Sequence, residues 1–243
     1  GEDSDFVKVR VRGVFPSASA KQFINREDVD AAMNRDVGQV NYSRTVAILG
    51  VDVAREGDDR SAIATKIGRD CTMPLKVFRG LDGPQLGMQV LMYANELKQK
   101  GIPRVYINLD YTGVGASPYD WLKDKVQHLN KVISASQSTN PQRWANKRAE
   151  MWDKMRDFIR DDGVIPKSEE LAEDLCIPEK LIDQKGRLLL ESKDSMKRRG
   201  MNSPDTADAL ALCFAIPIQE YIEDDNWRHQ RINRHKGIRD PYA

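Results

Sequence analysis

Three aspartates lie where an acidic side chain needs a partner. Asp52 and Asp110 each end an apolar run and are followed by a glycine-containing loop. Asp205 opens an apolar, helix-like segment, and Asp208 lies three residues further along the same predicted face. A buried carboxylate must be paired, placed at a wet edge or bound to a metal. Because no thiol or imidazole accompanies these oxygen ligands, the pattern predicts a site for Mg²⁺ or Mn²⁺.

Each acid also has a simpler interpretation. An aspartate after a strand is a common turn former, and an aspartate in the first turn of a helix is stabilised by free backbone amides. Asp58 and Asp59 belong to an acidic turn, and solvated turn residues are their ordinary interpretation. Of these two, Asp58 is the preferred extra ligand, because its spacing of six residues allows the chain to return to the strand end at Asp52.

The predicted strands bring two of the acids to one edge of a sheet. Strand-like runs over residues 45–53, 61–67 and 74–79 are joined by short turns, which implies an antiparallel meander. A strand over 104–110, a helix over 117–125 and a strand over 131–135 then imply parallel pairing. If the strands ending at Asp52 and Asp110 are parallel neighbours, both carboxylates emerge at the carboxyl edge, where α/β sheets place their sites.

Helical spacing accounts for most of the remaining chain. Helices are predicted over residues 25–35, 83–100, 146–160, 168–176 and 204–216. In the last of them Ser203 is the expected N-cap and Pro204 the first residue, which puts Asp205 at the second position. Residues 180–183 and 187–191 predict a hairpin, and residues 7–14 alternate as a half-exposed strand would.

Overall charge says little about partners, because 38 basic residues balance 37 acidic ones to a net charge of +1. Basic side chains are concentrated locally, and solvated surface is the ordinary interpretation of such runs. Next to a carboxylate cluster they are also candidates for holding phosphates. The candidate DNA contacts are Lys147, Arg148, Lys193, Lys197, Arg198 and Arg199.

Several classes of protein are disfavoured. The three cysteines are far apart and form no CxxC pair, so a zinc finger or disulfide framework is not expected. A Walker A loop is missing, and Gly113-Val114-Gly115 lacks the third glycine of a dinucleotide fingerprint. No apolar run reaches about 18 residues and the N-terminus is no signal peptide, so we expect a cytosolic protein without a membrane span.

Four blocks of this sequence together resemble a known family. GVDVAREGDDRSAI, LDYTGVGASPYDWL, NKRAEMW and SKDSMKRRGMNSPDTADALALCFA are similar to the C-terminal nuclease domain of the large terminase subunit of tailed bacteriophages. The resemblance implies an α/β, ribonuclease H-like fold: a mixed sheet of three antiparallel strands and then parallel strands, flanked by helices, with a small β-hairpin. It divides the chain into a lead-in from a missing ATPase domain (1–43), packed on a nuclease domain (44–218), and a basic, flexible tail (219–243).

The resemblance also implies an activity. The family cuts concatemeric double-stranded viral DNA during genome packaging, in the cytoplasm of the infected bacterium, with two divalent metal ions. Because the predicted DNA contacts are to phosphates, we expect low sequence specificity. The implied catalytic metal ligands are Asp52, Asp110 and Asp205, with Asp58 as an additional acid. Many relatives carry adjacent acids where this chain has Ser203-Pro204-Asp205, so Asp208 could share the third role. Implied partners are double-stranded DNA, the capsid portal, the small terminase subunit and the ATPase domain.

Two rival functions stay open. An actin-like phosphotransferase or ATPase also has an aspartate after its first strand, but it would need glycine-rich adenosine loops in a second repeat, which the sequence does not show. A noncatalytic packaging module could instead dock on the portal through the basic tail. Metal-dependent nicking of plasmid DNA, lost on Asp52→Ala, would distinguish the nuclease from both.

Overall fold

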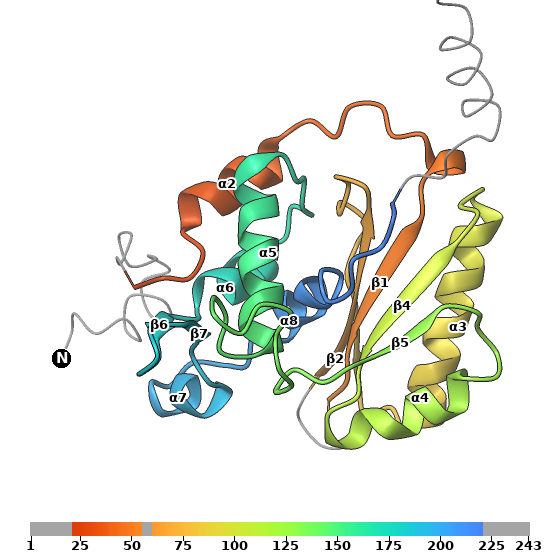
Figure 1. Ribbon diagram of the computed structural model, residues 1–243. Coiled ribbons are helices and arrows are strands. Elements are labelled where there is room, and N and C mark those ends of the chain that lie inside the picture. Colours follow the sequence, from red (N-terminus) through yellow and green to blue (C-terminus); the bar gives the residue numbers. More distant parts are fainter. Residues whose placement is uncertain (1–20, 55–59, 221–243) are drawn as a thin grey trace, which may run out of the picture.

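A five-stranded mixed sheet forms the centre of the molecule (Figure 1). The computed structural model describes residues 21–54 and 60–220. The strands are arranged in the order β3-β2-β1-β4-β5, and β1 is antiparallel to β2 and parallel to β4. This is the predicted ribonuclease H-like arrangement. The strand bounds are β1 (Ala47–Asp52), β2 (Arg60–Ile67), β3 (Lys76–Arg79), β4 (Val105–Asp110) and β5 (Leu129–Val132).

Helices cover both faces of this sheet (Figure 1). On one face lie α3 (Gly83–Gln99) and α4 (Ala116–Leu122). On the other, α8 (Asp205–Leu212) lies directly on the sheet, with α5 (Lys147–Asp161) and α6 (Glu169–Cys176) packed against it. The remaining elements are α2 (Arg26–Asn34), the short 3₁₀ turns η1 (Tyr42–Arg44) and η2 (Gly113–Gly115), the predicted hairpin of β6 (Lys180–Ile182) and β7 (Leu188–Leu190), and α7 (Lys193–Arg198).

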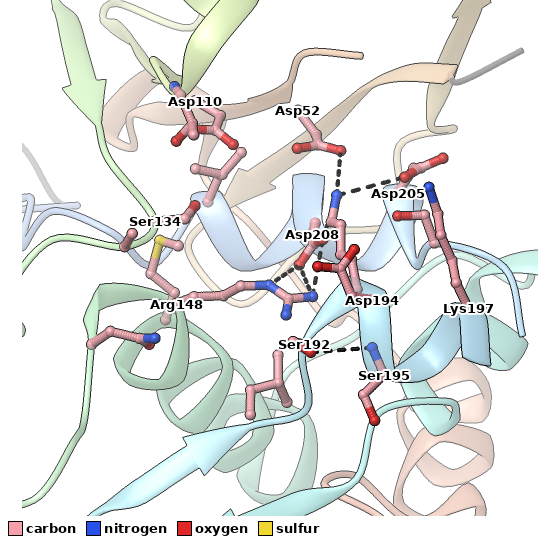
Figure 2. Close-up of a pocket in the computed structure, with 18 of the residues that line it drawn as sticks. Asp52, Asp110, Ser134, Arg148, Ser192, Asp194, Ser195, Lys197, Asp205 and Asp208 are labelled. Carbon is pink, nitrogen blue, oxygen red and sulfur yellow. Dashed lines mark hydrogen bonds and ion pairs between the residues drawn. The ribbon is translucent and has the colours of Figure 1, made fainter. Parts of the chain in front are cut away.

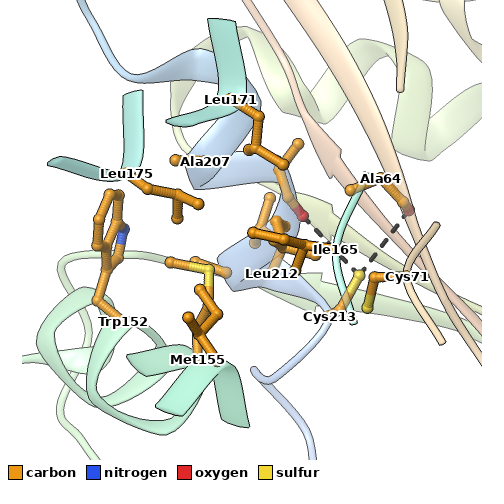
Figure 3. Close-up of a cluster of buried hydrophobic side chains, with 14 of the residues drawn as sticks. Ala64, Cys71, Trp152, Met155, Ile165, Leu171, Leu175, Ala207, Leu212 and Cys213 are labelled. Carbon is orange, nitrogen blue, oxygen red and sulfur yellow. Dashed lines mark hydrogen bonds between the residues drawn. The ribbon is translucent and has the colours of Figure 1, made fainter. Parts of the chain in front are cut away.

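The burial of β1 on both faces explains its unbroken apolar sequence. Leu49 and Val51 pack towards α3 and α4, whereas Ile48 belongs to the core beneath α8. At Gly50, an added Cβ would stand only 2.0 Å from the carbonyl oxygen of Ala209. The missing side chain therefore lets the backbone of α8 approach the strand directly. Figure 3 shows the core between α8, α5 and α6.

Several predicted boundaries are wrong. The fifth strand ends at Val132, whose carbonyl accepts from Tyr111 N–H at the end of β4, so further residues find no neighbouring strand to pair with. The last helix begins at Asp205, with Pro204 rather than Ser203 as its N-cap, and this moves Asp205 from the second position to the first. That helix ends at Leu212, after which i→i+3 hydrogen bonds tighten the chain into turns.

Other expectations have different outcomes. The helix α7 was not anticipated from the sequence. The predicted strand over residues 7–14, the acidic turn with Asp58 and Asp59, and most of the predicted tail lie outside the described residues. None of the helices within 21–54 and 60–220 has the length and apolar character that a membrane crossing requires.

Candidate metal centre

Asp52 and Asp110 lie beside each other at the carboxyl ends of β1 and β4. These strands are parallel and pair Val51 with Leu109, so the next residue of each strand emerges at the same edge. Asp52 is only 5% exposed, and Asp110 accepts a hydrogen bond from Thr112 N–H at 3.0 Å, which fixes the turn after β4. The parallel register of β1 and β4 therefore places both carboxylates at the same edge of the sheet, as we expect from the sequence.

Helix α8 brings two more carboxylates to this edge. Asp205 and Asp208 are one turn apart, and both residues are at most 8% exposed. Figure 2 shows the four acids around one cleft, whose volume is about 850 Å³. The opposite wall of the cleft is built by α7 and by apolar residues of the β6–β7 hairpin.

The ammonium group of Lys193, the first residue of α7, stands among three of these acids. Its Nζ lies 3.0 Å from Asp208, 3.7 Å from Asp52 and 3.8 Å from Asp205. Burial acts to lower the pKa of Lys193, but the surrounding carboxylates outweigh burial and raise it. The protein thus holds a positive charge at the centre of its acidic cluster.

The two acids of α8 have different surroundings. Asp208 accepts hydrogen bonds from Arg148 Nε at 3.1 Å and from Trp152 Nε1 at 2.8 Å, in addition to the contact with Lys193. Burial would raise its pKa, but the charges of Arg148 and Lys193 lower it. The ion pairs of Asp205, with Lys193 at 3.8 Å and with Arg60 at 3.7 Å, are looser, and burial raises its pKa although Lys193 and a hydrogen bond with Ser203 lower it.

Electrostatics at the strand ends favour a further cation. Burial raises the pKa of Asp52, the nearby charges of Asp208, Asp110 and Asp205 raise it further, and Lys193 only partly opposes them. Burial also raises the pKa of Asp110. Four carboxylates face three nearby basic side chains, Lys193, Arg148 and Arg60, of which Arg60 is shared with Glu170, so the cluster remains short of positive charge.

The chemistry of this donor set fits a hard divalent cation. All four candidate ligands offer carboxylate oxygens, and they line an open cleft. As the side chains stand, residues 21–54 and 60–220 contain no group of three acidic, histidine or cysteine side chains that could hold a metal ion. The Lys193 ammonium lies between Asp52, Asp205 and Asp208, within 4 Å of each.

The predicted DNA contacts fall into two groups. Lys193, Lys197 and Arg198 lie on α7 and line the cleft. The other three, of which Arg148 also lines the cleft, are paired inside the protein, as Lys193 is: Lys147 is 3.2 Å from Glu150, Arg148 is bound to Asp208, and Arg199 to Glu191 at 2.6 Å. Their charges therefore stabilise the walls of the site, whichever additional contacts they make.

Sequence reasoning missed three residues around the site. Trp152 lies on α5, and its indole N–H donates a hydrogen bond to Asp208. Its spacing of four from Arg148 was the available clue, because such residues share a helix face. Arg60 and the buried Asp174 approach the start of α8 from β2 and α6, and no sequence pattern links them to it.

Comparison with known proteins gives the fold a context. No family model matches the sequence, and no curated protein is detectably similar to it. The nuclease domain of the large terminase subunit gp2 of bacterial virus Sf6 superposes with a TM-score of 0.64, at 20% identity, over 81% of this chain and 99% of that one. A mutant of that domain, solved with manganese, gives a TM-score of 0.63 at 20% identity over 80% and 99%.

A second phage protein gives the same result. The large terminase nuclease of the thermophilic phage G20c, solved with bound magnesium, has a TM-score of 0.57 at 10% identity, over 81% of this chain and 98% of that one. These identities are low, but the matched structures are covered almost completely. The chain therefore has the ribonuclease H-like fold of the nuclease domains of phage large terminase subunits, as the sequence resemblance implied.

Proposed function

We propose that this protein is a divalent-metal-dependent endonuclease that cuts double-stranded viral DNA during genome packaging. The observation that carries the proposal is the convergence of Asp52, Asp110, Asp205 and Asp208 on one cleft, with basic side chains on the facing helix α7. Two structural relatives, solved with manganese and with magnesium, support the choice of metal.

We propose Asp52, Asp110 and Asp205 as the metal ligands, and Asp208 as the acid of α8 that shares the role of Asp205. Divalent cations bound there, two in our proposal, would activate water and stabilise the leaving oxygen of a phosphodiester. The chain's own contribution is to hold the carboxylates at fixed positions. Asp110 is fixed by its hydrogen bond from Thr112 N–H, and Asp208 by Arg148 and Trp152.

Lys193 is the residue that must respond to the metal. Its ammonium lies within 4 Å of three carboxylates, so an added cation at the same place would repel it. The side chain borders the cleft, together with Lys197 and Arg198, and in our proposal all three then contact the DNA backbone. Phosphate contacts carry no sequence information directly, which accounts for the low specificity that we expect.

The partners follow from the same proposal. We expect the ATPase domain of a full-length large subunit, the small terminase subunit and the capsid portal to bring DNA to this domain, in the host cytoplasm. The acid Asp58 remains a proposed additional ligand that lies outside the described residues.

Plasmid cleavage combined with direct metal binding tests the proposal. We expect the wild-type protein to nick and linearise plasmid in Mn²⁺ or Mg²⁺ and to bind Mn²⁺ in a calorimeter, and Asp52→Asn to lose both. Asp124→Asn is the matched control, because Asp124 is exposed on the chain after α4. Equal cleavage by wild type and Asp52→Asn, or no Mn²⁺ binding by the wild type, would refute the proposal.

A further inference from the structure

The first turn of α8 does not cap itself. Its N-cap is Pro204, which has no side-chain acceptor and makes no side-chain capping hydrogen bond. The first backbone N–H groups of a helix have no partner within the helix, and when buried they require one from elsewhere. Thr206, the second residue of α8, is completely buried. An acceptor from another element is therefore required at this place.

Asp174 of α6 provides this acceptor. One carboxylate oxygen of Asp174 accepts from Thr206 N–H at 3.0 Å and from the Thr206 hydroxyl at 2.6 Å. Asp174 is only 5% exposed, and it lies on a helix 32 residues away in the sequence. The contact thus ties α6 to the exact turn of α8 that carries Asp205.

A second contact from the same side reaches Asp205 itself. Arg60, at the start of β2, has its Nε 3.7 Å from Asp205 Oδ2, and its guanidinium also contacts Glu170. Glu170 precedes Asp174 by one turn of α6, so both acids lie on one face of that helix. Asp174 of α6 therefore holds Thr206 directly, and Arg60 of β2, which is paired with Glu170 of α6, contacts Asp205.

We infer that Asp174 is a positioning residue of the nuclease site, which holds the first turn of α8 so that Asp205 is directed towards Asp52 and Asp110. The peptide group between Asp205 and Thr206 is shared by both residues, so fixing Thr206 N–H restricts the backbone from which the Asp205 carboxylate extends. The inference rests on the proposed function, because it assigns Asp174 to the proposed metal ligand.

The alternative is that Asp174 only joins two helices. A joint of that kind would affect stability, but it would leave the metal affinity of the folded protein unchanged. Residues that orient metal ligands behave differently, since their loss typically lowers metal affinity or activity by about 10- to 100-fold. Metal affinity measured on folded protein therefore separates the two roles.

Substitution of Asp174 provides the experiment. We expect Asp174→Ala to weaken Mn²⁺ binding by at least about tenfold in calorimetry, and to lower kcat for plasmid cleavage. Asp174→Asn keeps an acceptor oxygen for both Thr206 donors, and we expect it to restore Mn²⁺ affinity to within a few-fold of wild type. Wild-type affinity in Asp174→Ala, with only its thermal midpoint lowered, would overturn the inference.

A milder pair of variants covers the case in which Asp174→Ala does not fold. Thr206→Val removes the hydroxyl donor and keeps the backbone one, whereas Thr206→Ser keeps both. We expect weaker Mn²⁺ binding in Thr206→Val alone, and equal binding by both would overturn the inference.

Amide hydrogen exchange tests the positioning role of Asp174 separately from the proposed nuclease function, because the measurement needs no metal. Faster exchange at Thr206 in Asp174→Ala, measured in EDTA, is the expected result, and unchanged exchange would overturn the positioning role. If the wild-type protein binds no Mn²⁺, the proposed nuclease function fails, whatever the exchange result.

Discussion

Gly50→Ala should damage the site through the backbone of α8 without touching any charged residue. Gly50 lies in β1, two residues before Asp52, and an added Cβ would be 2.0 Å from the carbonyl oxygen of Ala209 and 3.0 Å from Cys213 N. Both contacts are with the backbone, so no side-chain rotation can relieve them. Either β1 or α8 has to move.

The size of the movement follows from these distances. Real Cβ atoms essentially never approach other heavy atoms closer than 3.0 Å, so the contact with Ala209 falls short by about 1 Å. Overpacking of a core typically costs about 1–3 kcal/mol. A misplacement of about 1 Å in a catalytic constellation can cost about 100-fold in rate. A 100-fold loss corresponds to about 2.7 kcal/mol, so we expect the variant, when fully folded, to lose cleavage by as much as its stability falls.

The assay compares denaturant unfolding with plasmid cleavage under conditions where the variant is fully folded. Gly101→Ala is a matched control. Gly101 follows α3 and has a φ of 91°, and an added Cβ would have no heavy atom within 4 Å. This control should lose stability through backbone strain and keep its specific activity. If Gly50→Ala cleaves at the wild-type rate, the proposed dependence of the site on close contact between α8 and β1 is refuted.

Two further predictions concern other carboxylates. Glu150 is fully buried, and although burial raises its pKa, hydrogen bonds from Lys154, Thr139 and Lys147 lower it to about 2. The ionised form therefore stabilises the fold above pH about 4.5, and this stability, of order 3 kcal/mol, is lost as pH falls towards 2. In Glu150→Gln, the unfolding free energy should depend less on pH over that range. For the acids of α8, Asp208→Asn should lower the unfolding free energy in EDTA by about 1–3 kcal/mol, since its buried donors lose an ionic acceptor, whereas Asp205→Asn should reduce Mn²⁺ affinity with little loss of stability. An Asp205→Asn variant that is destabilised but keeps full Mn²⁺ affinity would contradict this division.

How much the sequence predicts depends on whether the determining contacts are local. The positions of Asp52 and Asp110 follow from strand ends and parallel pairing, and both can be read from short runs of residues. Helix α7 could not be anticipated in this way, because six largely polar residues are too few to form a stable helix alone. Its stability comes from packing and from residues outside it: Met196 is completely buried, Glu191 just before the helix accepts from the Ser195 hydroxyl, and Arg199 just after it donates to the distant Ile177 carbonyl. Lys193, at the start of α7, reaches the acids only because this helix forms.

The burial of Asp174 is a second feature that the sequence does not predict. In the sequence it is one of several acids in a short amphipathic helix, where a solvated position is the ordinary interpretation. Its burial becomes explicable only when α8 is placed with a proline at its N-cap and Thr206 facing α6.

The features of α8 can be understood as parts of one arrangement. Gly50 allows the helix to lie close to β1, and Asp174 satisfies its first turn from the side of α6. Neither contact involves a candidate ligand, yet together they determine where Asp205 and Asp208 can stand relative to Asp52. Burial then raises the pKa of Asp52, and Lys193 offsets only part of this effect. Because the backbone is fixed by packing, β1 and α8 cannot move apart to relieve the repulsion between their carboxylates. The cluster is therefore held together at a cost in free energy that a divalent cation would remove, which is the physical basis for expecting metal to stabilise this fold.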